Sequence, residues 1–465
     1  MSERTSQTTG EGDSLYEVRQ KVYPRAVTGA FARWRWLLVW ITQLVFYGTC
    51  WLPWNGRQAV LLHLAERKFY IFGWVFWPQD VFYLSVILII SAYTLFLFTA
   101  AAGRLWCGYA CPQTVYTEIF LWIEKFFEGD RSRRIKLDAR GFSGEKTWRK
   151  GGKYVAWVAL SAWTGISFVG YFTPIRELLD SLHHLSLGGW ELFWILFYSA
   201  FTYLMAGIMR EQVCKYMCPY ARFQGVMFDP DTLVITYDEA RGEPRGARRK
   251  NAGAQELGDC VDCEICVQVC PTGIDIRKGL QYECIGCAAC IDACDQVMDK
   301  VGSPRGLIRY STENAIKQKW GRSDIVRHVL RPRILIYSAA LCAICIAFVW
   351  ALATRIPLRM DVIKDRSVIT REVEGGLIEN VYILNLMNMS ESIRRFEVSV
   401  SGLEGASLDG VSQVAVDAAQ NKSLPVRVRV PVEGLNQGSH TVFFSVRALD
   451  DPSLQVREKA VFVAP

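Results

Sequence analysis

Eight cysteines between positions 260 and 294 repeat one pattern twice, Cys-x-x-Cys-x-x-Cys-x-x-x-Cys. Three thiolates on such a tight loop can bind three irons of a cubane, and the last cysteine of the other copy reaches the fourth iron. The spacing therefore predicts two [4Fe-4S] clusters with crossed ligation. The expected ligands are Cys260, Cys263, Cys266 and Cys294 for one cluster, and Cys284, Cys287, Cys290 and Cys270 for the other.

Zinc is the alternative for these cysteines, because zinc ribbons also bind through Cys-x-x-Cys pairs. Zinc does not require a third cysteine at the next x-x interval, and here that cysteine occurs in both copies. The first copy is followed by Pro271 and the second by Asp295, a difference that concerns the turn after Cys294 more than its ligation. Iron–sulfur clusters pass single electrons and perform no reaction alone, so a further redox site is expected.

A second pattern, Cys-x-x-x-Cys-Pro, also occurs twice, each time after an arginine at the end of an apolar run. If each pattern is helical, its two thiols share one helix face with Cβ atoms about 5–6 Å apart, and they can bind one soft ion such as Cu(I). Buried structural cysteines and a reversible disulfide are the alternatives, and Arg104 and Arg210 are expected to lower the thiol pKa values. The recurrence predicts a duplicated membrane unit. Its candidate catalytic or copper-binding residues are Cys107, Cys111, Cys214 and Cys218.

Two other groups give weaker signals. Cys342 and Cys345 lie inside another apolar run, where they could relay electrons or copper, although cysteine is also a common small apolar residue in such runs. His63, His183 and His184 could bind a metal or could be ordinary surface histidines. Neither group alone predicts a site.

The chain that must position these residues is strongly apolar for its length. Of 465 residues, 51% are hydrophobic and 13% aromatic, which indicates a membrane protein. Five stretches approach the length of about 20 residues that crosses a hydrocarbon core. These predicted spans are 36–54, 81–102, 154–172, 192–209 and 334–353. The shorter run FYIFGWVFWP at 69–78 is predicted to be an interfacial or re-entrant segment.

Basic residues predict the orientation of these spans. The N-terminal tail 1–35 and the loop 104–153 are rich in Lys and Arg, whereas the segment after the third span has only Arg176. Because positively charged loops stay in the cytoplasm, the tail and the basic loop are expected there. The same rule explains the net charge of +7, so no nucleic-acid partner is expected.

This orientation predicts the domain organisation. Four spans form a membrane domain at 36–209, and the domain 210–333, with the ferredoxin motif 260–294, follows in the cytoplasm. A fifth span at 334–353 then places 354–465 outside. A six-span alternative would put the ferredoxin motif outside, against its charge and its thiolate chemistry.

The segment 354–465 differs in composition from the rest of the chain. Runs such as NVYILNL, RRFEVSVSG, SLPVRVRVPV and HTVFFSVRAL alternate apolar and polar residues and are separated by Gly, Asn, Asp and Pro. This pattern predicts an all-β immunoglobulin-like sandwich, without a disulfide because the segment has no cysteine. The expected fold class is therefore a membrane α-helical bundle with an inserted 2[4Fe-4S] ferredoxin-like domain and a C-terminal sandwich.

These features together resemble one known family. The segment YPRAVTGAF, both Cys-x-x-x-Cys-Pro motifs, the doubled ferredoxin motif and the outer β domain resemble the cytochrome c oxidase accessory proteins of the CcoG/FixG family, over about 23–465. The ferredoxin part alone is also similar to the membrane-bound quinol-dehydrogenase subunits of nitrate reductases. The fifth span and the β domain favour the accessory proteins.

The resemblance implies a function. It implies a multi-pass protein of the bacterial inner membrane that reduces Cu(II) to Cu(I) for assembly of cbb-type cytochrome c oxidase, with assembly factors and copper chaperones or transporters as partners. It also implies that the eight motif cysteines are cluster ligands, and it leaves open whether the other four bind copper or a further cofactor. A quinol-linked electron conduit and a non-enzymatic assembly scaffold remain alternatives. The electron donor and the oligomeric state, a homodimer included, are also left open.

Overall fold

The computed structural model describes residues 21–247, 257–365, 370–410, 412–433 and 435–465. Residues 1–20 of the predicted N-terminal tail lie outside these ranges. The chain divides into two compact units. The first comprises residues up to 40, 96–160 and 201–334, and the second comprises 41–95, 161–200 and 335–465.

Five long helices overlap the five predicted spans, although the first ends at Gly48, so that residues 49–54 of the predicted span 36–54 are not helical. They are α1 (Ala30–Gly48), α2 (Val81–Ala102), α6 (Gly144–Val169), α8 (Gly189–Thr202) with the π-helix η2 (Tyr203–Met209), and α15 (Pro332–Ala353). Within the described ranges, three helical segments are long and apolar enough to cross a membrane, namely Pro78–Ala102, Gly189–Met209 and Pro332–Ala353. The first turns of α1 and α6 contain basic residues, so the count of five spans stays a prediction.

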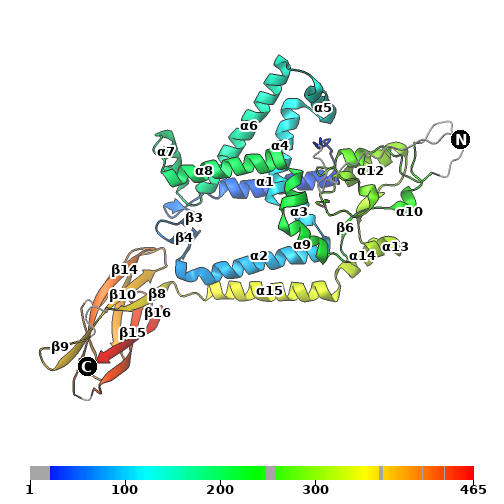
Figure 1. The fold of residues 1–465 in the computed structure, drawn as a ribbon. Helices are drawn as coiled ribbons and strands as arrows, with labels where there is room; N and C mark the ends of the chain where they lie inside the picture. Colours follow the sequence, from blue (N-terminus) through cyan, green and yellow to red (C-terminus); the bar gives the residue numbers. More distant parts are fainter. Residues whose placement is uncertain (1–20, 248–256, 366–369, 411, 434) are drawn as a thin grey trace, which may run out of the picture. The chain divides into compact units, whose positions relative to one another are not determined.

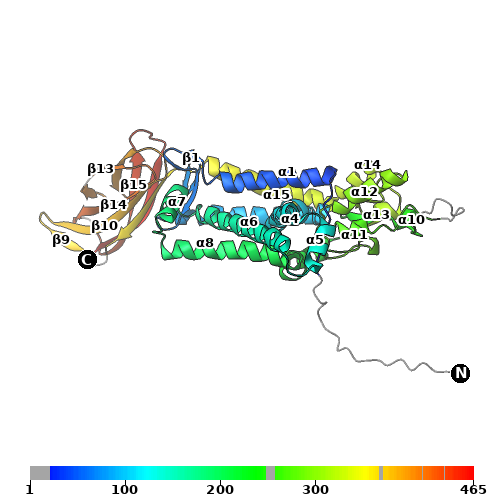
Figure 2. The same cartoon turned by 90° about the horizontal axis from the view of Figure 1, so that it is seen from above.

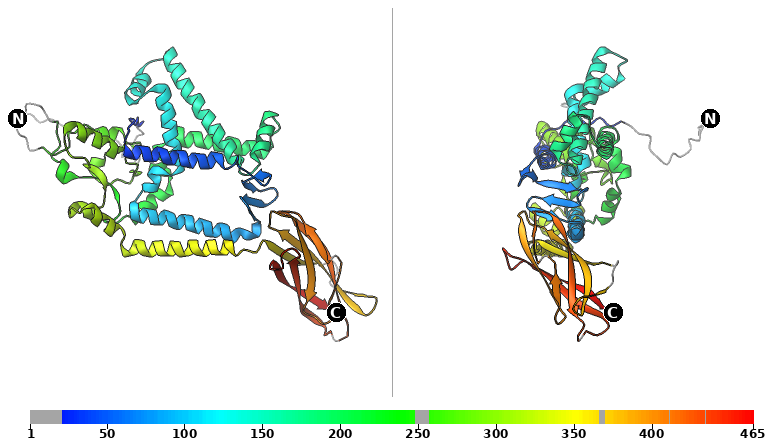
Figure 3. Two further views of the ribbon diagram at one scale, coloured as in Figure 1. Left: turned by 180° about the vertical axis from the view of Figure 1, so that it is seen from behind. Right: turned by 90° about the vertical axis from the view of Figure 1, so that its left-hand side faces the viewer.

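Within the second unit, α2 and α15 run side by side in opposite directions (Figure 1; Figure 3, left). The Tyr83 hydroxyl of α2 donates to the Ala351 carbonyl oxygen at 3.3 Å, and the rings of Tyr93 and Tyr337 meet edge to face. The outer faces of both helices expose large apolar side chains such as Leu88 and Trp350. Such apolar faces are stable in the hydrocarbon core of a membrane, because they are not in contact with water there.

The segment predicted to be interfacial or re-entrant instead forms strands. A three-stranded antiparallel sheet contains β3 (Val60–His63), β4 (Lys68–Ile71) and β5 (Trp74–Phe76). Phe72, at φ 51°, and Gly73 form the two-residue turn between the last two strands. The run is apolar on both faces, which hides the period of two in the sequence, and its place at a membrane interface stays a prediction. The neighbouring short elements are β1 (Pro53–Trp54), β2 (Arg57–Gln58), η1 (Pro78–Asp80) and α7 (Ile175–His183).

The C-terminal β-rich domain is confirmed as a two-sheet sandwich. One sheet has the order β12-β14-β10-β8 with β9 beside β10, and the other has the order β13-β11-β15-β16. Figure 2 shows β10 and β14 lying side by side, in agreement with their antiparallel register. The strands are β8 (Leu358–Lys364), β9 (Arg371–Val373), β10 (Leu377–Asn388), β11 (Arg394–Ser401), β12 (Ser407–Asp409), β13 (Gln413–Val416), β14 (Asn421–Pro431), β15 (Gly438–Ala448) and β16 (Gln455–Ala464).

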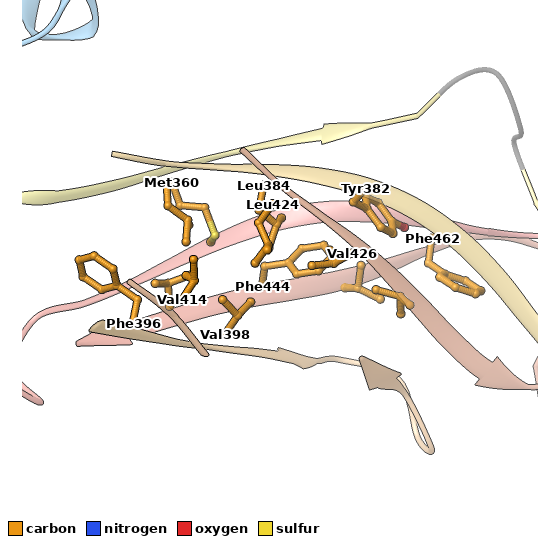
Figure 4. Packing of buried hydrophobic residues seen from close by; sticks show 14 of the residues in the cluster. Met360, Tyr382, Leu384, Phe396, Val398, Val414, Leu424, Val426, Phe444 and Phe462 are labelled. Carbon is orange, nitrogen blue, oxygen red and sulfur yellow. The ribbon is translucent and has the colours of Figure 1, made fainter. Parts of the chain in front are cut away.

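Alternating side chains of these strands form the core of the sandwich. Tyr382, Phe396, Phe444 and Phe462 are fully buried between the sheets, as Figure 4 shows. The Tyr382 hydroxyl donates to the Val461 carbonyl oxygen at 2.9 Å, so its polar atom is satisfied within the core. The domain thus builds its core without a disulfide.

The cysteine motifs lie in the first unit, on short elements around a small antiparallel sheet. Strands β6 (Val234–Tyr237) and β7 (Ile308–Ser311) pair and pack against the longest helix of this part, α12 (Ala289–Val301) (Figure 1). The remaining elements of this part are α10 (Glu239–Gly242), α11 (Ile265–Gln268), η4 (Ile276–Lys278), α13 (Glu313–Lys317) and α14 (Arg322–Val329). The segments next to the apolar helices are α3 (Leu105–Tyr109), α4 (Pro112–Glu128), α5 (Arg131–Ala139), η3 (Val213–Met217) and α9 (Pro219–Met227).

Candidate functional site

Two small cavities lie within the ferredoxin-like part of the first unit. The first is lined by four of the motif cysteines, Cys260, Cys263, Cys266 and Cys294. The second is lined by the other four, Cys270, Cys284, Cys287 and Cys290, and also by Cys266. Each cavity thus gathers one of the two sets that crossed ligation groups together, and Cys266 lies between the two.

Both copies of the motif shape their loop with the same backbone. The residue before the second cysteine is left-handed in each copy, Asp262 at φ 52° and Gly286 at φ 70°. The residue after the second cysteine is also left-handed, Glu264 at φ 54° and Ala288 at φ 59°, and a helix starts directly after it. Non-glycine residues adopt this conformation only where the surroundings demand it. The loops are therefore specialised to wrap their cysteines around a shared centre.

The electrostatics of the two cavities favour the binding of positively charged metal ions by the cysteine sulfurs. Burial raises the pKa of the Cys266 thiol to about 11 and that of Cys294 to about 12, so both thiols keep their protons unless a metal displaces them. Arg277 acts in the opposite direction on Cys266, because its charge favours the thiolate. Thiols with this donor chemistry suit iron–sulfur clusters.

The Cys-x-x-x-Cys-Pro motifs are not single helices, contrary to the prediction from their spacing. Cys107 lies in α3, whereas Cys111 is extended (φ −62°, ψ 128°) and is the N-cap of α4. Cys214 lies in η3, and Cys218 is likewise extended and is the N-cap of α9. The reason is the proline after each second cysteine, which disfavours a helical residue before it and is preferred at the first position of a new helix.

The structure nevertheless brings all four of these thiols together. Each of the six thiol pairs is close enough to interact electrostatically. The amide nitrogen of Gln224, a buried residue of α9, donates to the Cys107 sulfur at 3.2 Å. This hydrogen bond joins α3 to α9, which Figure 1 shows next to each other. The duplicated motifs therefore form one site.

Arg104 and Arg210 were expected to lower the pKa values of these thiols, but burial has the larger effect and raises the pKa values of Cys107 and Cys214. Burial raises the pKa of Cys107 to about 11 and that of Cys214 to about 12, and the Arg104 charge offsets this only in part. Arg104 donates to the Ala221 carbonyl oxygen at 2.5 Å, whereas Arg210 forms an ion pair of 3.0 Å with the buried Glu124. Both arginines thus have structural partners, and desolvation dominates the state of the thiols.

The four-thiol site lies directly against the second cavity. Cys107 and Cys214 pack on an apolar cluster that contains Ile285 and Cys287. A Cβ atom on Gly108 would lie only 2.7 Å from the Gly286 carbonyl oxygen, so α3 touches the second cysteine loop backbone to backbone. The two sites are therefore in contact within the first unit.

Several residues that fix this contact were not singled out from the sequence. Arg35 of α1 donates to the Cys287 carbonyl oxygen at 2.9 Å, and the Tyr310 hydroxyl donates to the Gly286 carbonyl oxygen at 2.6 Å. Asp292 accepts hydrogen bonds from the backbone nitrogens of Phe31 and Ala32 and thereby caps α1. Their positions in the sequence are far from the atoms they hold, and spacing alone gives no signal for such contacts.

The weaker candidates lie in the second unit and have local partners. Cys342 is exposed on α15 and Cys345 is half-buried. The ring nitrogen Nδ1 of His63 accepts from the Glu66 backbone nitrogen at 3.2 Å, and His184 contacts Asp180.

Comparison with known families assigns three parts of the chain. Residues 209–313 match a family described as a 4Fe-4S dicluster domain, and residues 84–134 match one described as a 4Fe-4S binding domain. Residues 348–465 match the immunoglobulin-like fold at the C-terminus of FixG, a putative oxidoreductase by its description. The dicluster match confirms iron–sulfur clusters over the zinc alternative.

Comparison with individual proteins extends over almost the whole chain. It is 38% identical to the nitrogen fixation protein FixG of Rhizobium meliloti, over 96% of this chain and 92% of the relative. It is 39% identical to protein RdxA of Cereibacter sphaeroides, over 90% of both chains. The ferredoxin-type protein NapH of Escherichia coli is 21% identical over 58% of this chain and 83% of its own. A crystal structure of a FixG-related protein from Vibrio parahaemolyticus aligns with 23% of this chain and 95% of its own, at 23% identity and a TM-score of 0.21.

Proposed function

Because this chain belongs to the FixG family and is a membrane-associated iron–sulfur electron-transfer protein, we propose that it reduces Cu(II) to Cu(I) for the assembly of a cbb-type cytochrome c oxidase. The observation that supports this proposal most directly is the contact between the second cysteine cavity and the four-thiol site, at Gly108 and Gly286. Thiolate sulfur is a soft ligand that favours Cu(I) over Cu(II). A thiol site beside an electron carrier is therefore suited to copper reduction.

The residues of the two cavities have the following roles in this proposal. The first cluster would be held by Cys260, Cys263, Cys266 and Cys294, and the second by Cys284, Cys287, Cys290 and Cys270. When bound, the clusters supply single electrons, so each Cu(II) takes one electron that comes from a reduced ferredoxin or flavoprotein. Cys107, Cys111, Cys214 and Cys218 form the exit from which Cu(II) takes that electron.

Other side chains of the first unit stabilise the charged thiolates and exclude water. The charge of Arg277 favours the Cys266 thiolate at the first cavity, and the charges of Arg35 and Arg104 favour the thiolates of Cys287 and Cys284 at the second. Ile235 and Ile276 line the second cavity with apolar surface. Nearby positive charge and the exclusion of water both shift the reduction potential of an iron–sulfur site, because that potential depends on charge and solvent exposure.

The proposed location follows from the charge pattern of the sequence. The N-terminal tail and the first unit's cysteine motifs would lie in the cytoplasm of a bacterial cell, and the sandwich 354–465 would lie in the periplasm. The sandwich contains no cysteine and is proposed as a docking module for oxidase assembly factors or for copper chaperones and transporters.

The proposal is tested on the purified full chain with its clusters reduced and the excess dithionite removed. Anaerobic addition of Cu(II) in the presence of a Cu(I) chelator is expected to abolish the paramagnetic cluster signal as the Cu(I) complex appears, with one copper reduced per electron lost. Reoxidation by a quinone analogue but not by Cu(II) would favour the quinol-linked conduit.

A cellular test separates the enzyme from a scaffold. Replacement of all four exit thiols by serine is expected to abolish oxidase maturation at low copper, whereas Cys342→Ser with Cys345→Ser, the matched thiol control in α15, should leave it intact. Unimpaired maturation in the first variant would contradict the proposal and favour the non-enzymatic scaffold.

A further inference from the structure

Neither Cys-x-x-x-Cys-Pro motif can bind a metal cluster by itself. Residues 84–134 match a 4Fe-4S binding family, yet this stretch contains only two cysteines, Cys107 and Cys111. A [4Fe-4S] cluster requires four ligands. The other two must come from elsewhere in the chain if this part binds a cluster at all.

The second motif supplies two thiols at the required place. Cys107 and Cys214 pack on the same apolar cluster, and the charges of all six pairs among Cys107, Cys111, Cys214 and Cys218 would interact, so two segments far apart in sequence form one group of four sulfurs. The two halves match in detail. In each, the first cysteine belongs to a short helical turn and the second is the extended N-cap of a following helix, α4 or α9.

The arrangement of these sulfurs favours a cluster over a single ion. Among the described residues, no three His, Cys, Asp or Glu side chains converge on a point that one metal ion could occupy. In a cubane each thiolate binds a different iron, so four thiols contributed in pairs by two segments can share one cluster. The cysteines around the two cavities are likewise contributed by two segments each, as crossed ligation requires.

The surroundings of the group also suit a cluster with net negative charge. Cys111 and Cys218 sit at the N-termini of α4 and α9, where the helix dipole favours anions. The buried Gln224 amide donates to the Cys107 sulfur at 3.2 Å. Hydrogen bonds to ligand sulfurs are a general feature of iron–sulfur sites and tune their potentials.

We propose that Cys107, Cys111, Cys214 and Cys218 together hold a third [4Fe-4S] cluster, shared between the two halves of the duplicated unit and in contact with the second cavity. The proposal rests on the proposed function, because it names what the exit thiols hold. Copper would then take its electron from this cluster and would not need a thiolate of its own at this site. The three centres would form a series in the order of the first cavity, the second cavity and the four-thiol site.

Iron and sulfide analysis of the anaerobically reconstituted full chain tests this inference. About twelve irons and about twelve sulfides per chain are expected, because each cubane holds four of each. About eight of each in the wild-type chain, with the four thiols free to react with an alkylating reagent, would overturn the inference. The wild-type count decides the matter even if a variant fails to fold.

A variant locates the additional iron. Replacement of the four thiols by serine should lower the iron content by about a third. The paramagnetic signals of the two remaining clusters should persist and show that the ferredoxin-like part is intact. The control Cys342→Ser with Cys345→Ser should keep the full iron content. Equal iron content in the four-serine variant and the wild type would overturn the inference.

The outcome of the iron analysis is independent of the outcome of the copper-reduction test. A chain with about eight irons that still reduces Cu(II) would overturn the third cluster and leave the proposed function standing. A chain with about twelve irons that transfers no electron to Cu(II) would support the third cluster and contradict the proposed function.

Discussion

At the scale of single residues, the contact between α3 and the second cysteine loop depends on Gly108. A Cβ atom at this position would meet the carbonyl oxygen of Gly286 at 2.7 Å and the Cα atom of Cys287 at 2.9 Å. Both neighbours are backbone atoms of a loop held in a left-handed conformation, so they cannot move aside cheaply. The side-chain size at this one position therefore controls how closely the two cysteine sites approach.

We expect Gly108→Ala to destabilise this region by about 1–3 kcal/mol through overpacking and to impair cluster retention in the second cavity. Iron content and the cluster absorbance band after purification measure the effect. Gly151→Ala is the control, because an added Cβ in that part of α6 meets nothing within 4 Å and alanine favours the helix. Equal iron retention in both variants would show that the close approach is not required.

Glu379 of the sandwich gives a prediction for pH dependence. Its side chain is buried and contacts Arg371 and Arg429 of neighbouring strands. Burial alone would raise the pKa of Glu379, but the hydrogen bonds from these arginines outweigh it and hold the pKa below its ordinary value of 4.5. A carboxyl group with a lowered folded-state pKa stabilises the fold above its unfolded pKa, and this contribution is lost as pH falls through the folded pKa.

We expect Glu379→Gln to destabilise the sandwich near pH 7 by about 1 kcal/mol, a modest value because both arginines are partly exposed. The difference from the wild type should vanish at a pH well below 4. Hydrogen exchange of peptides from β10 and β14 in the full chain measures both effects. A difference that stays constant down to pH 3 would show that the ionised carboxylate is not the stabilising group.

At the scale of elements, the first turn of α1 is capped by a residue from α12. Asp292 is buried and accepts from the backbone nitrogens of Phe31 at 3.2 Å and Ala32 at 2.7 Å. The capping residue comes from the second cysteine motif, between Cys290 and Cys294. The start of the first apolar helix and the cluster-binding helix are therefore joined by one side chain.

Asp292→Ala should cost about 1–2 kcal/mol, the usual value for loss of an N-cap, and should increase hydrogen exchange in the first turn of α1. Asp299→Ala on the same helix is the matched control, because that carboxylate is partly exposed and pairs with Arg305. Protection of the peptide that contains residues 29–33 is the measurement. Identical exchange in the two variants would contradict the capping role.

Sequence patterns predicted those elements whose period is local. The alternation in β14 and β15 was sufficient to predict the sandwich, and the repeated ferredoxin spacing was sufficient to predict the two groups of cysteines. Each pattern depends only on residues that are neighbours along one strand or loop. The spacing of Cys107 and Cys111 misled, since α3 ends at Tyr109 and Pro112 starts α4, so the two cysteines do not share one helix. The contact of Gly108 with Gly286 could not be predicted, because it is set by packing between distant segments.

At the scale of the whole molecule, the charges of the flanking segments predict the orientation of the apolar helices. The loop 104–153 contains many Lys and Arg residues, whereas Arg176 is the only Lys or Arg between the third and fourth predicted spans. One predicted span, 334–353, lies between the ferredoxin motif and the sandwich, so it would put them on opposite sides of the membrane. The proposed electron delivery from the cytoplasm and the proposed docking of periplasmic partners both depend on that separation.

Single cysteines introduced at exposed positions test the orientation directly. Ser439→Cys in β15 and Ser132→Cys in α5 replace exposed serines on the two predicted sides. In intact spheroplasts, a membrane-impermeant maleimide should label Ser439→Cys above the background of the parent chain, and it should label Ser132→Cys only after permeabilisation. This outcome follows because the basic loop is held inside by its positive charge, while the fifth apolar helix carries the sandwich across. Labelling of both positions in intact spheroplasts would contradict the five-span arrangement. Labelling of Ser132→Cys alone would invert the orientation and remove the cytoplasmic source of electrons from the proposed function.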